Sequence, residues 1–260
     1  MTSKYNARRL DGKVAVVTAS TDGIGYAIAE RLGHEGCKVV ISSRRQANVD
    51  KALNSLVKSG LDRKNVAGIE CHVANNEHRK RLLKFAVEQF GAIHILVNNA
   101  GINPAFGDII DITESEWDKL FDVNVKATFL LTQQAVPIIQ KSGGGSIIFN
   151  ASTGAYSPPS GIAAYGITKT CLLAMTKAFS QSLAPLNIRV NAVAPGLVRT
   201  KMAQTIVESD VVKEQGGFND LKRVGEPQEI GGAVAYLVSS DASYVTGETH
   251  IVSGGTPSRL

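Results

Sequence analysis

Tyr165 and Lys169 stand four positions apart, in a stretch whose composition favours a helix. Side chains at positions i and i+4 of a helix share one face, with Cβ atoms about 5–6 Å apart. A free phenol, with a pKa of about 10, is a poor acid–base catalyst near neutral pH. A neighbouring ammonium favours the phenolate, so we expect Lys169 to lower the pKa of Tyr165 and make it a proton-transfer group. This spacing also arises by chance, so its place in the fold must support the interpretation.

Other polar residues follow apolar runs on either side of this pair. Ser152 comes just after the run 146–149 and precedes Tyr165 by thirteen residues, and Asn98–Gly101 closes another apolar run. In open α/β folds, ligands bind at the carboxyl edge of the sheet, where such residues meet. Ser152 as a helix or turn cap, Asn124 as a structural residue within a helix and Asn98–Gly101 as a tight turn are alternatives that the sequence leaves open.

Short β-branched runs alternate with longer helical patterns along the chain. This alternation predicts an α/β fold in a single domain, 1–260: a Rossmann-type, doubly wound parallel sheet of about seven strands with helices on both faces. The strand runs are apolar on both sides, as strands buried between two helix layers should be. Strands are predicted at 14–17, 39–41, 66–71, 93–97, 146–149, 189–193 and 250–252, and helices at 25–35, 49–59, 77–90, 114–140, 164–184 and 228–239.

Local signals refine the element boundaries. Thr113 with Glu116 predicts a capping box, and Pro227 suits the first position of a helix. The long segment from Pro195 to Gly225 is weakly patterned, and such segments often cover active sites. We therefore expect a substrate lid over residues 197–224.

The turn after the first strand indicates a dinucleotide site. The strand is followed by Thr18, Ala19, Ser20, Thr21, Asp22, Gly23, Ile24 and Gly25, and then by a helix. Glycines let the backbone approach a diphosphate, and free amides at a helix N-terminus attract the anion. An ordinary strand-to-helix turn is the alternative.

The end of the second strand indicates which dinucleotide. NAD-preferring folds place an acidic residue there for the ribose 2′-hydroxyl. This strand ends in Ser42, Ser43, Arg44 and Arg45, with no carboxylate before Asp50. Guanidinium pairs well with a 2′-phosphate, so we expect NADP(H), with Arg44 as the phosphate partner.

Composition excludes several classes of protein. The net charge of +5 is scattered rather than gathered in a basic patch, so we expect no nucleic-acid partner. The 3 cysteines show no metal-ligand or disulfide spacing, which predicts no metal site and a reducing compartment. No apolar run reaches the length of about 18 residues needed for a membrane span, and the first residues lack a secretory apolar core.

These motifs together resemble the short-chain dehydrogenases/reductases of the classical type, over essentially the whole chain. The resemblance implies that Tyr165 protonates a carbonyl oxygen as hydride arrives, that Lys169 binds the nicotinamide ribose and lowers the pKa of Tyr165, and that Ser152 hydrogen-bonds the carbonyl oxygen. Asn124 would position a water between Lys169 and solvent. The cofactor-binding residues expected on these grounds are Ser20, Thr21, Asp22, Gly23, Ile24, Ser43, Arg44, Val73, Asn99, Ala100, Gly101, Tyr165, Lys169, Pro195, Gly196, Val198 and Thr200.

Two positions depart from the family pattern. The first glycine of the turn is replaced by Ala19, so the turn must accommodate a Cβ atom there. The Asp-Val pair that usually contacts adenine is replaced by His72 and Val73. Val73 keeps a backbone contact in this comparison, whereas the aspartate side-chain bond cannot be carried over.

Within the family, several segments resemble peroxisomal NADPH-dependent carbonyl reductases. That resemblance implies reduction of aromatic ketones, α-dicarbonyls and retinal, with retinol oxidation in reverse. Apolar residues near the catalytic segments predict a permissive substrate pocket: Phe106, Pro159, Ile162 and Met202, beside Ser152. The tail Ser258-Arg259-Leu260 resembles a peroxisomal address read by an import receptor, with cytoplasmic residence as an alternative. Apolar residues around much of helix 164–184, with the family's habit of pairing this helix, predict a homotetramer.

Other functions stay open. A 3-oxoacyl-thioester or steroid-type reductase shares the expected fold, although the sequence shows no basic entrance for an acyl carrier. A catalytically idle NADP-binding module would need only the cofactor half, and a structural subunit would need neither half. The presence of Ser152, Tyr165 and Lys169 together argues against the last two.

Overall fold

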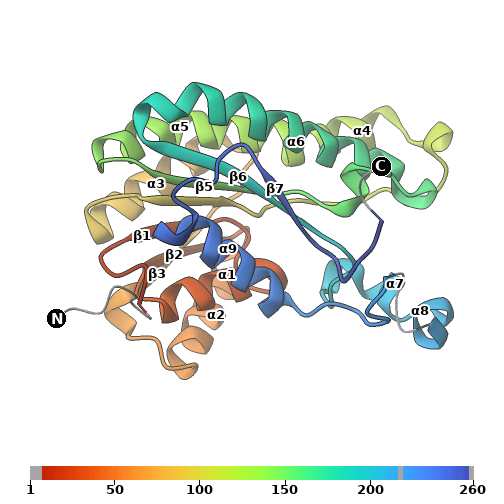
Figure 1. Cartoon of the computed structure of the whole chain (residues 1–260), viewed down its shortest axis with the longest axis horizontal. Coiled ribbons are helices and arrows are strands. Elements are labelled where there is room, and N and C mark those ends of the chain that lie inside the picture. The colour runs from red at the N-terminus through yellow and green to blue at the C-terminus, as the bar shows by residue number, and fades with distance from the viewer. Residues whose placement is uncertain (1–7, 216–218, 258–260) are drawn as a thin grey trace.

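The computed structural model describes residues 8–215 and 219–257 and contains one seven-stranded sheet in this part of the chain (Figure 1). All neighbouring strands run parallel, in the order β3-β2-β1-β4-β5-β6-β7. The predicted Rossmann-type fold is therefore confirmed. The strands are β1 Val14–Val17, β2 Lys38–Ser43, β3 Val66–Glu70, β4 Ile95–Asn98, β5 Gly145–Asn150, β6 Ile188–Pro195 and β7 Thr249–Val252.

Helices cover both faces of the sheet (Figure 1). One layer holds α1 Gly23–His34, α2 Gln46–Lys58 and α9 Pro227–Val238. The other holds α3 Asn76–Phe90, α5 Ala127–Lys141 and α6 Ala163–Leu183, with α4 Glu114–Phe121 beside them. Two short helices, α7 Gln204–Val207 and α8 Asp210–Gln215, lie at one end of the molecule.

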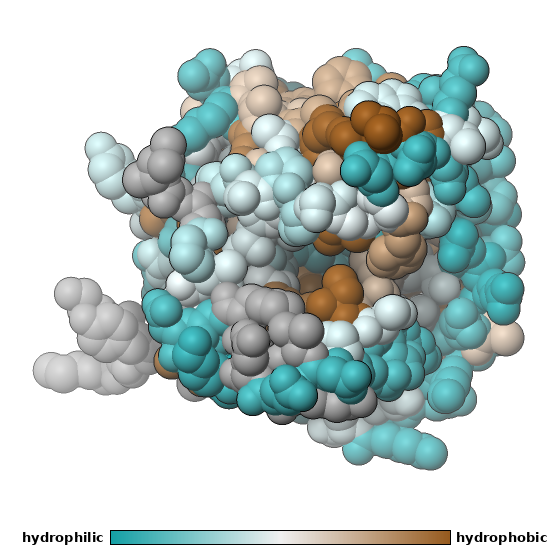
Figure 2. All heavy atoms as spheres, turned by 90° about the vertical axis from the view of Figure 1, so that its right-hand side faces the viewer, coloured by the Kyte–Doolittle hydropathy of each residue, from teal (hydrophilic) through white to brown (hydrophobic). Residues whose placement is uncertain are grey.

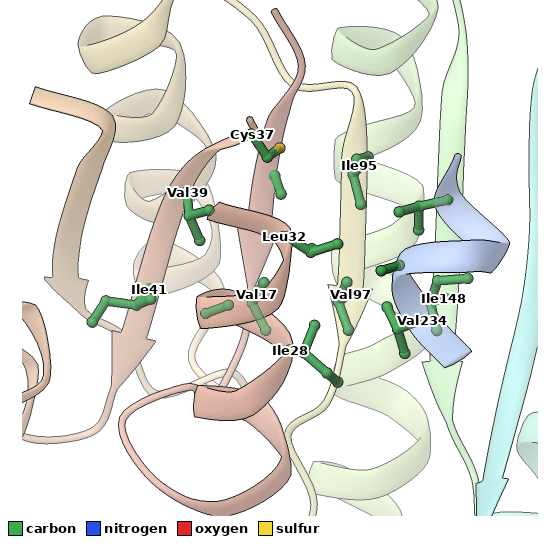
Figure 3. Close-up of a cluster of buried hydrophobic side chains, with 14 of the residues drawn as sticks. Val17, Ile28, Leu32, Cys37, Val39, Ile41, Ile95, Val97, Ile148 and Val234 are labelled. Atoms are coloured by element: carbon green, nitrogen blue, oxygen red, sulfur yellow. The ribbon is translucent and has the colours of Figure 1, made fainter. Parts of the chain in front are cut away.

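Successive strand residues face opposite helix layers, which explains the unbroken apolar runs. On β1, Val17 lies in one apolar cluster with Ile28 and Leu32 of α1 (Figure 3), whereas Val16 lies in the other cluster with Leu131 of α5. Both valines have no exposed surface. Because the central strands β1 and β4 are buried at every position, a period-two pattern is absent from their sequence.

The helix predicted at 114–140 is present as one helical run formed by α4, a π-type turn and α5. A single wider π-type turn, Asp122–Lys126, separates α4 from α5, and the N–H of Ala127 donates to the carbonyl of Asp122 across it. Thr113 and Glu116 form the predicted capping box at the start of α4. Asn124 lies in the π turn, and such turns often occur at functional sites.

The segment 197–224 is more regular than its sequence suggests. It contains a 3₁₀ turn at Lys201–Ala203 followed by α7 and α8, and Pro227 begins α9 as predicted. The described residues contain no helix that is long and apolar enough to cross a membrane and no group of metal-ligating side chains. The tail Ser258-Arg259-Leu260 lies outside the described residues.

Candidate active site

The turns after four adjacent strands bring the candidate residues to one edge of the sheet. Strands β1, β4, β5 and β6 are neighbours and parallel, so their carboxyl ends lie together. The glycine turn follows β1, Asn99–Gly101 follow β4, Ser152 follows β5 and Gly196 follows β6. This edge is the ligand-binding edge of open α/β sheets.

Tyr165 and Lys169 lie on the first turns of α6, as predicted. The Lys169 Nζ is 5.4 Å from the centroid of the Tyr165 ring. Lys169 is 3% exposed, and its Nζ donates a 2.6 Å hydrogen bond to the backbone carbonyl of Asn150. The last residue of β5 therefore holds the ammonium beside the phenol.

Ser152 has two contacts at this site. Its side chain hydrogen-bonds Tyr165, and its Oγ accepts a 3.1 Å bond from the N–H of Gly154. The second bond caps the 3₁₀ turn Thr153–Ala155. Ser152 is thus both a turn cap and a neighbour of the phenol, so the two interpretations of this serine are compatible.

The pKa of Tyr165 lies above its ordinary value in this structure, so burial outweighs the lowering that the sequence predicts. Burial raises the pKa of Tyr165 to about 12, and the hydrogen bond with Ser152 offsets only part of that rise. Burial also lowers the pKa of Lys169 to about 8. Desolvation penalises the charged form of each group, and the ammonium gives its hydrogen bond to a carbonyl rather than to the phenol. Tyr165 is therefore a protonated phenol at neutral pH.

Asn124 braces the site through its side-chain amide. Its Oδ1 accepts from the N–H of Ile102 at 2.8 Å, and its Nδ2 donates to the Ile102 carbonyl at 2.9 Å and to Thr168 Oγ1 at 3.0 Å. Asn124 is fully buried. The amide fixes the loop after β4 against the residue that precedes Lys169.

Asn99 fixes the glycine turn. Its Nδ2 donates 3.0 Å bonds to the carbonyls of Thr18 and Ala19, and its N–H donates to Thr18 Oγ1 at 3.0 Å. Ala19 adopts a φ of 49°, the left-handed conformation that favours glycine. A Cβ at Gly25 would lie 2.4 Å from both the Ala19 carbonyl oxygen and Asn99 Nδ2, so only glycine fits there.

The glycine turn fits a dinucleotide diphosphate. In the described part of the chain, the N–H groups of Ile24 and Gly25 at the start of α1 have no hydrogen-bond acceptor. Free amides at this end of a helix bind anions. The residues present are therefore suited to the phosphates of a nucleotide cofactor.

Arg44 and residues 72–73, where the adenosine part of the cofactor is expected, differ in the hydrogen-bonding groups that they leave free. Arg44 is exposed beyond β2 and pairs with no carboxylate among the described residues. The carbonyl of Val73, by contrast, already accepts a 2.6 Å bond from Arg79. The N–H of His72 is also occupied, since it donates to His78 Nδ1 at 3.2 Å.

Apolar residues border the site on one face of the molecule. Figure 2 shows hydrophobic residues on both sides of a hollow at the end that carries α7 and α8. Phe106 and Met202 are 60% and 53% exposed, Pro159 is exposed and Ile162 is half-buried. None of these four predicted substrate residues lines the 490 Å³ cavity found between α1 and residues 199–208.

Three functional features were missed from the sequence. Asn150 holds Lys169 through its carbonyl and joins Asn99 through a 2.8 Å amide–amide bond. Thr168 anchors Asn124. Lys201 forms an ion pair with Asp22. The position of Asn150, two residues before Ser152, was the one available signal, since the other contacts join segments distant in sequence.

This fold and this site define an oxidoreductase, and comparison with known proteins shows that the chain belongs to the short-chain dehydrogenase/reductase family. The family model described as "Enoyl-(Acyl carrier protein) reductase" matches residues 18–257. Dehydrogenase/reductase SDR family member 4 of Caenorhabditis elegans is 53% identical over 98% of this chain and 99% of its own, and the human protein of that name is 50% identical over 100% and 94%.

Proteins of lower sequence identity also match nearly the whole chain. Tropinone reductase-like 3 of Erythroxylum coca is 48% identical over 99% of this chain and 98% of its own. A solved structure, a putative short-chain alcohol dehydrogenase from Sinorhizobium meliloti, superimposes with a TM-score of 0.89 at 30% identity, covering 96% of this chain and 98% of that one. Membership of this family implies a nicotinamide cofactor and a reductase of the member 4 type.

Proposed function

We propose that the protein is an NADPH-dependent carbonyl reductase that acts on aromatic ketones, α-dicarbonyls and retinal, and that oxidises retinol or other alcohols in reverse. The observation that carries this proposal is the position of the Tyr165 phenol beside the Ser152 hydroxyl and the Lys169 ammonium. The phenol can give its proton to a carbonyl oxygen because the Ser152 hydroxyl and the Lys169 ammonium lie where they can stabilise the phenolate that remains. The sequence identity to the member 4 relatives, which extends over nearly the whole chain, supports a reductase function as well.

The proposed mechanism assigns one task to each side chain. The bound nicotinamide supplies the hydride that reaches the carbonyl carbon. Ser152 donates a hydrogen bond to the carbonyl oxygen and orients it, and Tyr165 transfers its phenol proton to that oxygen as negative charge develops there. Lys169 stabilises the resulting phenolate and, with a pKa of about 8, can return a proton to it. Asn124 braces the loop that carries Ile102 and positions a water on the path from Lys169 to solvent.

The cofactor is assigned to NADP(H) on the charge at the end of β2. Arg44 is exposed there without a carboxylate partner in the described residues, so a 2′-phosphate would gain a new charge-assisted bond. The remaining contacts come from the glycine turn at 20–24, Ser43, the N–H of Val73 and residues 99–101. The end of β6 and the loop that leads to the 3₁₀ turn Lys201–Ala203 add the last group: Pro195, Gly196, Val198 and Thr200.

Substrate is placed on the apolar side of this edge. Phe106, Pro159, Ile162 and Met202 would surround the group attached to the carbonyl once the lid segment, residues 197–224, closes over it. Walls without polar anchors distinguish related ketones weakly, since one methylene is worth about 1–3 kcal/mol. We therefore propose a broad range of apolar carbonyl substrates.

The remaining parts of the proposal rest on the family resemblance. They are a single domain over 1–260, a homotetramer in which α6 packs against a second copy, and peroxisomal import through Ser258-Arg259-Leu260. A tagged chain that stays in the cytoplasm when its last three residues are intact would contradict the import proposal.

A rate screen tests the proposed reaction. Initial rates would be measured with NADPH and with NADH against a benzil-like diketone, an aromatic ketone, retinal and a 3-oxoacyl thioester. We expect the diketone with NADPH to be among the best pairs. Turnover confined to the thioester would instead assign the protein to 3-oxoacyl reduction, and binding of NADPH without any turnover would indicate an idle cofactor-binding module.

A further inference from the structure

An ion pair joins the glycine turn to the lid segment. Lys201 Nζ lies 2.5 Å from Asp22 Oδ2, and the side chains of Lys201 and Asp22 are 84% and 58% exposed. Asp22 caps α1, since its Oδ1 accepts a 2.9 Å bond from the N–H of Gly23. Lys201 begins the 3₁₀ turn that opens the lid segment. The ammonium therefore lies at the end of the helix where the cofactor's diphosphate is expected.

The side chain of Thr200, next to Lys201, lies against the glycine turn. A Cβ built on Gly23 would lie 3.2 Å from Thr200 Cγ2, so the residue before Lys201 packs directly on the glycine turn. The 490 Å³ cavity beside them is lined from both sides, by Gly23 and Tyr26 of α1 and by Thr200 and Lys201 of the lid segment. A ligand bound at the turn would meet Lys201 with little movement of the backbone.

The carboxylate of Asp22 occupies part of the site where a phosphate would bind. It takes the N–H of Gly23, one of the donors that a helix N-terminus offers to a phosphate. A diphosphate placed there would be repelled by this carboxylate unless a cation compensates the charge. Lys201 is the cation in direct contact with it, whereas Arg199, the lid residue next to Thr200, is paired with Glu226.

We propose that Lys201 is a cofactor-binding residue, which pairs with Asp22 in the free protein and with the diphosphate when the dinucleotide binds. This inference rests on the proposed function, because it needs a dinucleotide at the glycine turn. It deepens that proposal by assigning a second cationic contact, distinct from Arg44 and common to NADPH and NADH. The exposed, unbranched side chain of Lys201 can exchange the Asp22 carboxylate for the diphosphate without a change in the fold.

A simpler role for the ion pair makes a different prediction. If Lys201 only latched the lid segment to Asp22, either single substitution would break the latch, and Lys201→Met would have no further effect once Asp22 is gone. If Lys201 contacts the diphosphate, Asp22→Asn removes a repelling charge while keeping a capping side chain. The two substitutions then act in opposite directions.

The test is a set of dissociation constants measured by NADPH and NADH fluorescence without a carbonyl substrate. We expect Lys201→Met to weaken binding of both cofactors about tenfold, the size of one charge-assisted contact. Asp22→Asn should tighten binding of both cofactors by a few fold, and Lys201→Met should still weaken binding in the Asp22→Asn background. Lys177→Met is the matched control, since Lys177 pairs with Glu248 at 2.9 Å with similar exposure.

Each outcome decides between the two roles. A dissociation constant for Lys201→Met within twofold of the Lys177→Met value, or a loss that disappears in the Asp22→Asn background, would overturn the inference while leaving the proposed function intact. Failure of the wild-type protein to bind either cofactor would overturn both. A thermal unfolding scan of each variant separates loss of binding from loss of folding.

Discussion

The ammonium of Lys169 lies 5.4 Å from the centre of the Tyr165 ring and gives its hydrogen bond to the carbonyl of Asn150. Both groups are carried by α6, and both are held by residues from the end of β5. The arrangement keeps a cation and a protonated phenol adjacent at the cost of desolvating each. The pKa shifts follow from that burial, and they yield a prediction about stability.

Lys169 should destabilise the free protein near neutral pH. Its pKa is about 8 in the folded protein, below the ordinary value of 10.5, so the unfolded chain binds more protons between these two values. Stability therefore rises with pH across this window, and the full penalty applies below pH 8. Lys169→Met should raise the unfolding free energy at pH 7 by about 2 kcal/mol, roughly 3 for the relieved burial less 1 for the lost hydrogen bond.

Urea unfolding of wild type and Lys169→Met at pH 7 and at pH 10 measures this difference. We expect the gap between the two proteins to narrow at the higher pH. A gap that stays constant with pH would mean that Lys169 is charged to the same extent in the folded and unfolded states.

Arg44 should decide the choice between the two cofactors. Arg44→Asp exchanges attraction of a 2′-phosphate for repulsion, so the ratio of kcat/KM with NADPH to that with NADH should fall about a hundredfold, or about 3 kcal/mol. Arg45→Asp is the matched control, because Arg45 is the neighbouring exposed arginine. Equal effects of the two substitutions would remove Arg44 from this role.

Ala19 should carry backbone strain that glycine would relieve. Its φ of 49° costs an L-residue about 1 kcal/mol. Glycine would relieve this strain, but its greater conformational entropy in the unfolded chain would offset part of the gain. We expect Ala19→Gly to stabilise the protein by about 0.5 kcal/mol with NADPH binding unchanged. Lys222→Gly, at a φ of 53° in the lid segment, provides a comparison outside the cofactor turn. A lower urea midpoint for Ala19→Gly would show that the alanine methyl contributes more by packing than it costs.

The sheet could be predicted from the sequence because each strand is an apolar run between turn residues. All seven strands were found, and the edge at which Ser152, Asn99 and Tyr165 meet follows from their parallel arrangement. The π turn between α4 and α5 could not be predicted, since residues 114–140 keep a helical pattern across it. A turn of that kind depends on tertiary contacts, here the burial of Asn124 against Ile102.

The pKa shifts in the site also could not be predicted from the spacing of its residues. Four residues of separation place Lys169 beside Tyr165, and from that alone an attraction between the ammonium and the phenolate is expected. Burial reverses the direction of the pKa shift, and it depends on residues distant in sequence. The hydrogen bond from Lys169 to Asn150 and the ion pair between Lys201 and Asp22 likewise join residues that are distant in sequence.

The most direct test of the account compares Tyr165→Phe with wild type in the reduction of a benzil-like diketone by NADPH. Removing one hydroxyl leaves the ring and its packing in place and deletes the proton donor. General acid catalysis contributes about 10²- to 10⁴-fold, so we expect kcat to fall about a thousandfold while the dissociation constant for NADPH changes less than threefold. A variant that retains a tenth or more of the wild-type kcat would contradict the assignment of Tyr165 as the proton donor.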